Sequence, residues 1–520
     1  MEKTQCSRTK NTFRNIFFGS IEKILILLFP FIIRTIIIYK LGAEYVGVGS
    51  LLTSILQVLS VTELGFASAI SFALYGPIAK SDTNEIIGWV SLLRTIYKIV
   101  GLIILVLGLI LLPFISFFIK DNPPDDINIY ILYAIFLFNT IIPYFTFGYK
   151  NSILSAHQRY DIINKINIII EIIKGSTQIL ILLLFKNYYA YIIALPLFSL
   201  LSNVLLNIIT NKIYPELNVK MKMNFKGVGK IKKQIAGITI GRISLVCRNS
   251  FDSIIISSIL GLTITAIYSN YYLIFSSLFS FLTIILVSMS ASVGNCLVTE
   301  SIEKNEKDHI KFDFFYMYLV GFCTICLFGL YQPFMIVWVG EELTFPDTTM
   351  YLFCIYFYVN SLSQVRSVYS EAAGLWWHFR YLAIAEMASN LLLNIILGII
   401  FGVNGILFAT IITATIFSFI SITIVTYIKL FKKSPINYFI RNVIYSLLTF
   451  IVIIGIYFIS KKISMSKWAN LFIMAAISVG GGCVLLVINM LFKDNRQYIA
   501  DIIKKVKMRK ENVQENQEEN

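Results

Sequence analysis

Two opposite charges lie deep inside one long apolar run of the chain. Arg248 is within a residue of the middle of the run 234–260, and Asp252 follows at i+4 on the same helical face. At the centre of a bilayer such groups cost ~2.5–3.5 kcal/mol each unless they are paired, hydrated or able to reach the headgroups. Two interpretations stay open: an ion pair Arg248–Asp252 that stabilises the helices, or polar groups that face a water-filled cavity.

Further cations occupy comparable positions. Lys23 and Arg34 lie eleven residues apart in the first apolar run and therefore on the same side of a helix, while Arg242 precedes Arg248 by about one and a half turns. Arg34 is also close enough to the end of its run to extend toward outer headgroups. If the four cations meet, they form a positive chamber that favours anions, and guanidinium forks suit phosphate in particular.

The second apolar run carries a polar stripe. Ser50, Thr53, Gln57, Ser60 and Glu63 recur at steps of three and four residues, so they share one face of a helix. Such a face should not meet lipid. It is expected either to form hydrogen bonds between helices or to line a cavity.

Composition indicates which elements hold these residues. Of 520 residues 57%, about 296, are apolar and only 14% are charged, against ~25% charged in soluble domains. Fourteen membrane-spanning helices of ~20 residues need ~280 apolar-rich positions. We therefore predict an all-α integral membrane protein, and we attribute the net charge of +15 to topology, with no nucleic-acid partner.

The runs and their flanking charges predict a topology. The expected spans are 15–39, 46–73, 92–119, 127–147, 162–185, 188–210, 234–260, 264–293, 312–338, 349–372, 381–401, 404–428, 440–460 and 468–492. Only six Lys lie in the loops on one side of these spans, and far more Lys and Arg lie on the side of the N-terminus. The positive-inside rule then places both termini in the cytoplasm.

An internal repeat divides the chain. His157-Gln-Arg-Tyr returns 221 residues later as His378-Phe-Arg-Tyr, Asn84-Glu returns at the same shift, and Leu41-Gly returns at 219 as Leu260-Gly. These matches predict two parallel six-helix lobes, a transporter architecture whose site lies between the repeats. The expected boundaries are 1–220 (first lobe), 221–435 (second lobe), 436–492 (two extra helices) and 493–520 (cytoplasmic tail).

Metal and enzyme chemistry are not expected. The three His lie far apart and the seven Cys are scattered, so no metal site and no cofactor is predicted. An enzyme that acts on the outer face would need a large outer loop, whereas the predicted outer loops are short. The sequence therefore disfavours an enzyme.

The stretch LGAEYVGVGSLLTSILQVLS with ELGFASAI, followed by AHQRYDIINKI, carries a family resemblance. Residues 10–435 resemble Wzx-type oligosaccharide-repeat-unit flippases, the polysaccharide transporter branch of the multidrug/oligosaccharidyl-lipid/polysaccharide exporter superfamily. The resemblance implies translocation of undecaprenyl-diphosphate-linked oligosaccharides from the inner to the outer leaflet of the bacterial cytoplasmic membrane. It also implies alternating access, a capsule or other surface-polysaccharide pathway, and a polymerase with assembly proteins as partners.

The family's cationic lumen maps onto Lys23, Arg34, Arg242 and Arg248. Because family members couple to ion gradients, Glu63 and Asp252 are the candidates to carry a proton or Na⁺. A multidrug/cation antiporter of the same superfamily is one alternative, but it would favour an acidic chamber, and the central charges here are mostly basic. A membrane-embedded polysaccharide polymerase is the other, and the short outer loops count against it.

Overall fold

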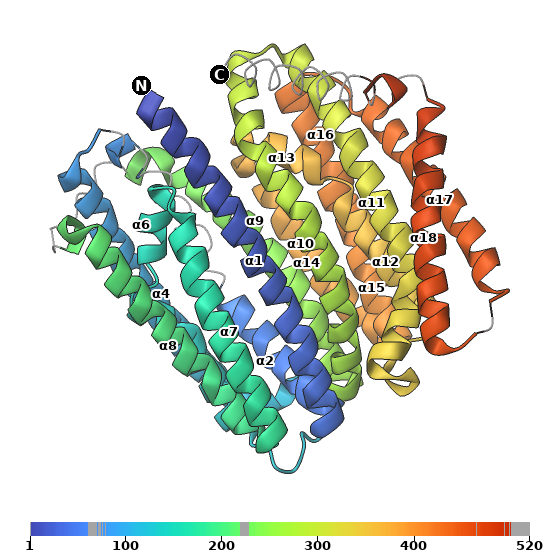
Figure 1. The fold of residues 1–520 in the computed structure, drawn as a ribbon, viewed down its shortest axis with the longest axis horizontal. Helices are drawn as coiled ribbons and strands as arrows, with labels where there is room; N and C mark the ends of the chain where they lie inside the picture. The colour runs from blue at the N-terminus through green and yellow to red at the C-terminus, as the bar shows by residue number, and fades with distance from the viewer. Residues whose placement is uncertain are drawn as a thin grey trace, which may run out of the picture. The chain divides into compact units, whose positions relative to one another are not determined.

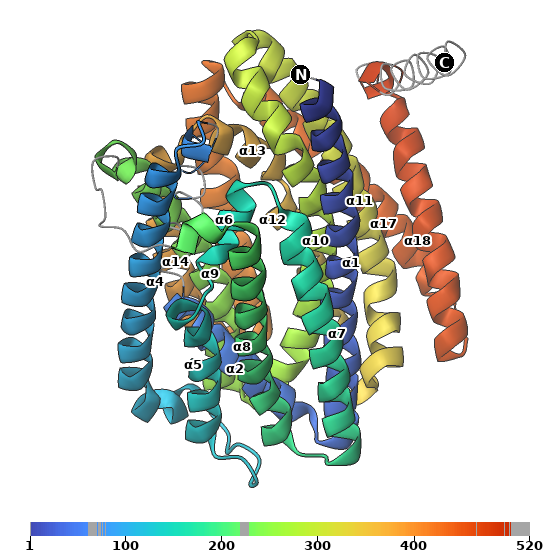
Figure 2. The ribbon, with the colours of Figure 1, turned by 60° about the vertical axis from the view of Figure 1, so that its left-hand side comes forward.

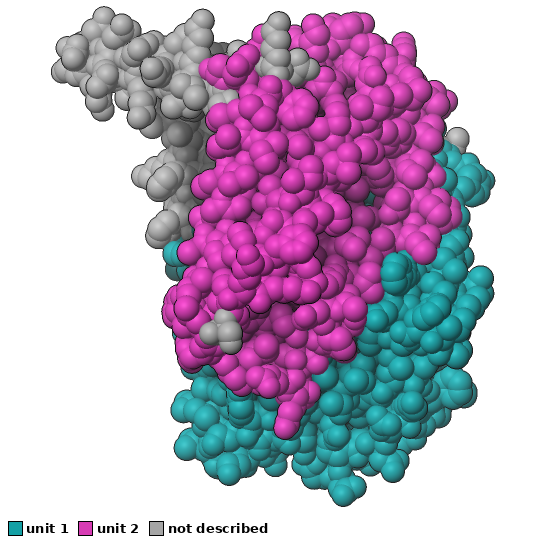
Figure 3. All heavy atoms as spheres, turned by 90° about the vertical axis from the view of Figure 1, so that its right-hand side faces the viewer, with its two compact units in different colours: residues 1–272, 376–409 teal, residues 273–375, 410–520 magenta. Residues whose placement is uncertain are grey.

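The computed structural model describes the chain except for residues 1, 61–69, 71–73, 75, 79, 219–227, 464, 493–494, 499 and 501–520, and it omits the side chains of 2–17, 218, 228–235 and 291. Every regular element described is helical, which confirms the all-α prediction (Figure 1). Contacts divide the chain into two compact units, 1–272 with 376–409 and 273–375 with 410–520, coloured separately in Figure 3. The predicted boundaries at 220 and 435 stay predictions.

The first unit holds α1 (Glu2–Lys40), α2 (Ala43–Ser60), α4 (Thr83–Leu111), η2 (Leu112–Phe118), α5 (Ile129–Phe145), α6 (Lys150–Ala156), α7 (Tyr160–Leu184), α8 (Tyr188–Ile213), η3 (Pro215–Asn218), α9 (Val228–Leu260) and α14 (Trp376–Phe401). It also includes the first turns of α10 (Leu262–Thr299) and of α15 (Val403–Thr413).

The second unit holds the rest of α10 and α15 together with α11 (Ile302–Val339), η5 (Glu341–Leu343), α12 (Asp347–Ser361), α13 (Gln364–Ala372), η6 (Ala414–Ser421), α16 (Ile422–Thr426), η7 (Tyr427–Phe431), α17 (Ile436–Ser460) and α18 (Lys467–Met490). Its α11 packs along α17 and α18 around a core of Ile325, Val452, Ile456, Met474 and Leu485.

Eleven of the described helices are long and apolar enough to cross a membrane, or twelve if α5 and α6 count as one span bent by 53°. The predicted runs 15–39 and 349–372 are helical as α1 and α12–α13, although neither is among these candidates. The chain is a multi-pass membrane protein. The count of fourteen and the cytoplasmic termini stay predictions.

Within the first unit, α1 packs along α7, and α9 packs along both α14 and α2 (Figure 2). Small residues permit this close packing, because a side chain at Gly175 of α7 would overlap the ring of Phe29 in α1. The repeated Leu-Gly pairs also share a structural role. Gly42 (φ 127°) ends α1 and Gly261 (φ 100°) ends α9, both in the left-handed region that favours glycine.

A very close backbone contact in the first unit is at Gly47 of α2, where an added Cβ would overlap the carbonyl oxygen of Leu262. We expect Gly47→Ala to lower the free energy of unfolding by about 1–3 kcal/mol, because the backbones of α2 and α10 must separate. The measurement is thermal unfolding in detergent. Gly88→Ala in α4 is the matched control, since nothing lies within 4 Å of its Cβ position; equal losses for the two variants would contradict the argument.

Candidate functional site

Arg34 lies in the last two turns of α1, half-buried against the start of α10. Its Nη1 donates hydrogen bonds to Ser269 Oγ at 3.0 Å and to Asn270 Oδ1 at 3.1 Å. Among the described residues no carboxylate lies within ion-pair distance of the guanidinium. The side chain is thus directed at α10, and its positive charge is solvated by neutral groups.

Aromatic side chains surround the same arginine. The phenols of Tyr188 and Tyr191, both in α8, are close enough to interact electrostatically with Arg34. The Tyr188 hydroxyl donates to the backbone carbonyl of Tyr45 at 2.8 Å, and the two rings lie 5.1 Å apart. These contacts join α2 and α8 beside Arg34, and all of the groups involved are uncharged.

Arg248 forms a buried ion pair, as one of the two sequence interpretations proposed, but with a different partner. The residue is 4% exposed, and its Nη1 lies 2.6 Å from Glu386 Oε1 of α14. The sequence places Glu386 nearer the inner surface, whereas the packing of α9 along α14 buries it. A buried carboxylate therefore balances the charge of Arg248.

Asp252, the predicted partner of Arg248, is 1% exposed and accepts hydrogen bonds from Tyr268 Oη at 2.9 Å and Asn394 Nδ2 at 2.7 Å. Asn394 also donates to Asn390 Oδ1 of the same helix at 3.3 Å. A carboxylate held by a phenol and an amide inside a helical bundle has the oxygen chemistry that suits a proton or a small cation.

The other predicted residues are placed differently. Lys23 of α1 and Arg242 of α9 are both exposed side chains on apolar helices. Glu63 lies outside the described residues. In the polar stripe, Gln57 Oε1 accepts a hydrogen bond of 3.4 Å from Ser250 of α9, which agrees with a role between helices.

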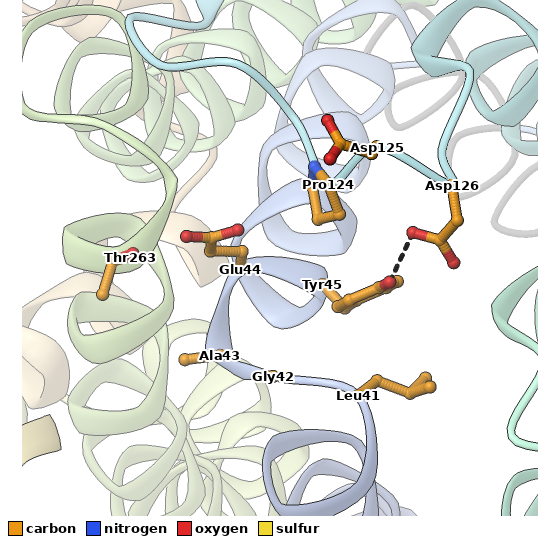
Figure 4. Close-up of a pocket in the computed structure, with 9 residues that line it drawn as sticks. All are labelled: Leu41, Gly42, Ala43, Glu44, Tyr45, Pro124, Asp125, Asp126 and Thr263. Atoms are coloured by element: carbon orange, nitrogen blue, oxygen red, sulfur yellow. Dashed lines mark hydrogen bonds between the residues drawn. The ribbon is translucent and has the colours of Figure 1, made fainter.

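A separate hollow of about 590 Å³ lies where α1 ends (Figure 4). Its lining residues are Leu41, Gly42, Ala43, Glu44, Tyr45, Pro124, Asp125, Asp126 and Thr263. Three of them are acidic, and the Tyr45 hydroxyl donates to Asp126 Oδ1 at 2.5 Å. The hollow is thus acidic, opposite in sign to the predicted cations.

Solved structures of transporters resemble this chain. The lipid II flippase MurJ in an inward closed conformation superposes with a TM-score of 0.61 at 17% identity, covering 91% of this chain and 99% of MurJ. A variant of the Vibrio cholerae MATE transporter VcmN gives 0.56 at 12% identity, covering 83% and 100%. An inward-facing multidrug resistance MATE family transporter of the MOP superfamily gives 0.58 at 14% identity, covering 78% and 97%.

The chain has the fold of these transporters. No family model and no curated protein matches the sequence. Of the four predicted cations, Arg248 is neutralised by Glu386. For the other three, the described residues provide no carboxylate partner: Lys23, Arg34 and Arg242.

Sequence reasoning missed the acidic partner of Arg248. Glu386, Asn390 and Asn394 recur at four-residue steps along α14, and all three are buried. This stripe, like the one in α2, repeats at a helical spacing and would have indicated a polar face that needs a partner helix. The stripe could not by itself show that the partner is α9, because that depends on which helices pack together.

Proposed function

We propose that this protein is a flippase for undecaprenyl-diphosphate-linked oligosaccharide repeat units. It would carry them from the inner to the outer leaflet of the bacterial cytoplasmic membrane for capsule or other surface-polysaccharide synthesis. The fold shared with the lipid II flippase MurJ over nearly the whole of both chains supports this function. The family resemblance of the sequence supports it independently.

The observation that carries the proposal is Arg34. A diphosphate cannot cross hydrocarbon unaided, because transferring a bare ion costs tens of kcal/mol. A guanidinium within the span, solvated by Ser269 and Asn270, keeps its positive charge available for an anion. A cationic multidrug substrate would be repelled by the same group.

In the proposed cycle Arg34, Lys23 and Arg242 bind the diphosphate in a wet cavity while the polyprenyl tail stays in lipid. Exposed cations on apolar helices are costly against hydrocarbon, and such a cavity would hydrate them. Arg248 joins this set by exchanging Glu386 for a phosphate oxygen. Alternating access then delivers the cargo to the other leaflet.

Ion coupling is proposed at Asp252, with Glu63 as the second candidate. Binding of a proton or Na⁺ to the Asp252 carboxylate would change its bonds to Tyr268 and Asn394, and so the packing of α9 on α14. Vesicle assays of flipping, run with a proton gradient, a Na⁺ gradient or none, test this coupling. Equal rates in all three would contradict it.

A multidrug/cation antiporter is the second candidate, because MATE transporters share the fold and two buried acids, Asp252 and Glu386, lie in the first unit. Deleting the gene separates the two functions. We expect loss of surface polysaccharide with unchanged drug susceptibility. Increased drug susceptibility with normal polysaccharide would overturn the flippase and support the antiporter.

A further inference from the structure

A second cationic site lies in the first unit, away from Arg34, at the break between α5 and α6. Lys150 is the first residue of α6 and only 4% exposed. Its Nζ donates to Asn207 Oδ1 of α8 at 2.6 Å and also to Asn211 Oδ1. Among the described residues no carboxylate lies within ion-pair distance of this ammonium. The charge is therefore buried without an opposite charge.

The charged neighbour of Lys150 is another cation. Arg94 of α4 has its Cζ 6.0 Å from the ring centroid of Tyr149, the residue before Lys150, and it interacts electrostatically with Lys150 itself. Arg94 likewise has no carboxylate within ion-pair distance in the described part of the chain. Two like charges that share a low-dielectric region repel each other. An anion that binds between them is attracted by both and offsets this repulsion.

The second unit contains a similar arrangement. The helix α12 is followed closely by the short α13, as α5 is by α6, and Arg366 lies in the first turn of α13. Arg366 is 2% exposed and donates from Nη2 to the backbone carbonyl of Ser418 in η6 at 2.8 Å. Each unit thus has a buried cation at the start of the short helix, held by oxygens of a later helix.

The two arrangements differ at one equivalent position. α4 begins after the N-cap Asp82 and α11 after the N-cap Ser301, and both cap side chains accept from the backbone amide three residues on. Arg94 and Asp313 each lie twelve residues after their cap. Asp313 is buried and interacts electrostatically with Arg366. The second unit therefore has a carboxylate where the first unit has Arg94.

We propose that Lys150 and Arg94 bind a phosphate group, which supplies in the first unit the negative charge that Asp313 supplies in the second. A lysine point charge beside an arginine fork suits a phosphate oxyanion, and basic pockets between membrane helices hold lipid headgroups. Thr210 adds a hydroxyl on the same face of α8 as Asn207; it is buried and has no hydrogen-bond partner among the described residues. The site goes beyond the proposed cargo route and does not depend on it.

Two titrations of the full chain, purified in a detergent without anionic lipid, test the two sources from which the phosphate could come. One arm titrates inorganic pyrophosphate at constant ionic strength, and the other titrates dioleoylphosphatidylglycerol against phosphatidylcholine. The readout is the melting temperature, Tm. We expect a saturable rise in Tm in at least one arm. Because the proposed cargo site also binds a diphosphate, the arm whose response Arg94→Gln weakens identifies a soluble or a lipid-borne phosphate at this site.

Arg94→Asp is the decisive variant, because it rebuilds the charge arrangement of the second unit. We expect it to raise Tm without ligand and to weaken phosphate binding about 10- to 100-fold, the loss of a charge-assisted bond. Arg94→Gln should weaken binding similarly and serves if the aspartate variant folds poorly. Lys98→Gln, an exposed cation one turn along α4, is the matched control and should bind as the unaltered chain does.

Two results would overturn the proposal. One is a chain whose Tm responds to neither pyrophosphate nor phosphatidylglycerol. The other is phosphate binding by Arg94→Asp as tight as by the Lys98→Gln control. Failure of the cargo assays alone leaves this site intact, since binding here is measured without any oligosaccharide.

Discussion

Arg34→Gln is expected to abolish export of surface polysaccharide while the chain stays folded. Glutamine keeps a donor for Ser269 and Asn270 but removes the charge that the diphosphate needs. Because the native partners are neutral, no buried carboxylate is left unpaired, and Tm should change little. The measurement is surface polysaccharide in a gene-deletion strain that expresses each variant at matched membrane level.

The conservative variant Arg34→Lys separates charge from geometry. It retains the charge but not the planar fork, so we expect partial export, clearly above that of Arg34→Gln. Normal export by the glutamine variant at matched expression would remove Arg34 from the site and, with it, the observation on which the proposed function rests.

For Arg248→Ala the expected loss is one of stability. Removing one member of a buried ion pair leaves the other charge uncompensated, which costs about 3–5 kcal/mol. Glu386 is that charge here, and it is buried between α9 and α14. We expect a markedly lower Tm and reduced membrane level, so an export defect in this variant alone cannot be assigned to lost cargo binding.

The double variant Arg248→Met with Glu386→Met resolves this ambiguity. Replacing both charges by apolar side chains of similar volume is often neutral or stabilising, so Tm should recover. Export should remain defective if Arg248 exchanges Glu386 for a phosphate oxygen, as proposed. Restored export would show that the pair only holds α9 against α14, and a Tm that stays low would contradict the assignment of the single-variant defect to the unpaired glutamate.

The sequence alone was sufficient to predict the helical class and most helix positions, because apolar length and flanking charge are local properties. The Leu41-Gly and Leu260-Gly pairs, part of the predicted repeat, are also local features: both glycines end a helix with positive φ. The spacing of Arg248 and Asp252 showed correctly that both belong to one polar face of α9, and both are buried.

Partners across helices could not be predicted in this way. Arg248 is paired with a residue 138 positions away, and Lys150 is held by α8 from more than fifty positions away. Periodicity identifies which face of a helix is polar, but not which helix covers it. The sequence also did not show that Asp313 occupies the position equivalent to Arg94, because this equivalence requires the alignment of the two helix caps.

The hydrogen bonds of Arg34 to the first turns of α10 have a consequence for how tightly cargo is held. The Arg34 guanidinium already donates hydrogen bonds to Ser269 and Asn270, and it must give these up in order to bind a phosphate. Cargo and α10 therefore compete for one side chain, and by thermodynamic reciprocity each weakens the other's hold by the same factor. A movement of α10 away from Arg34 would raise the affinity of Arg34 for the cargo phosphate. The return of α10 would lower that affinity and favour release of the cargo.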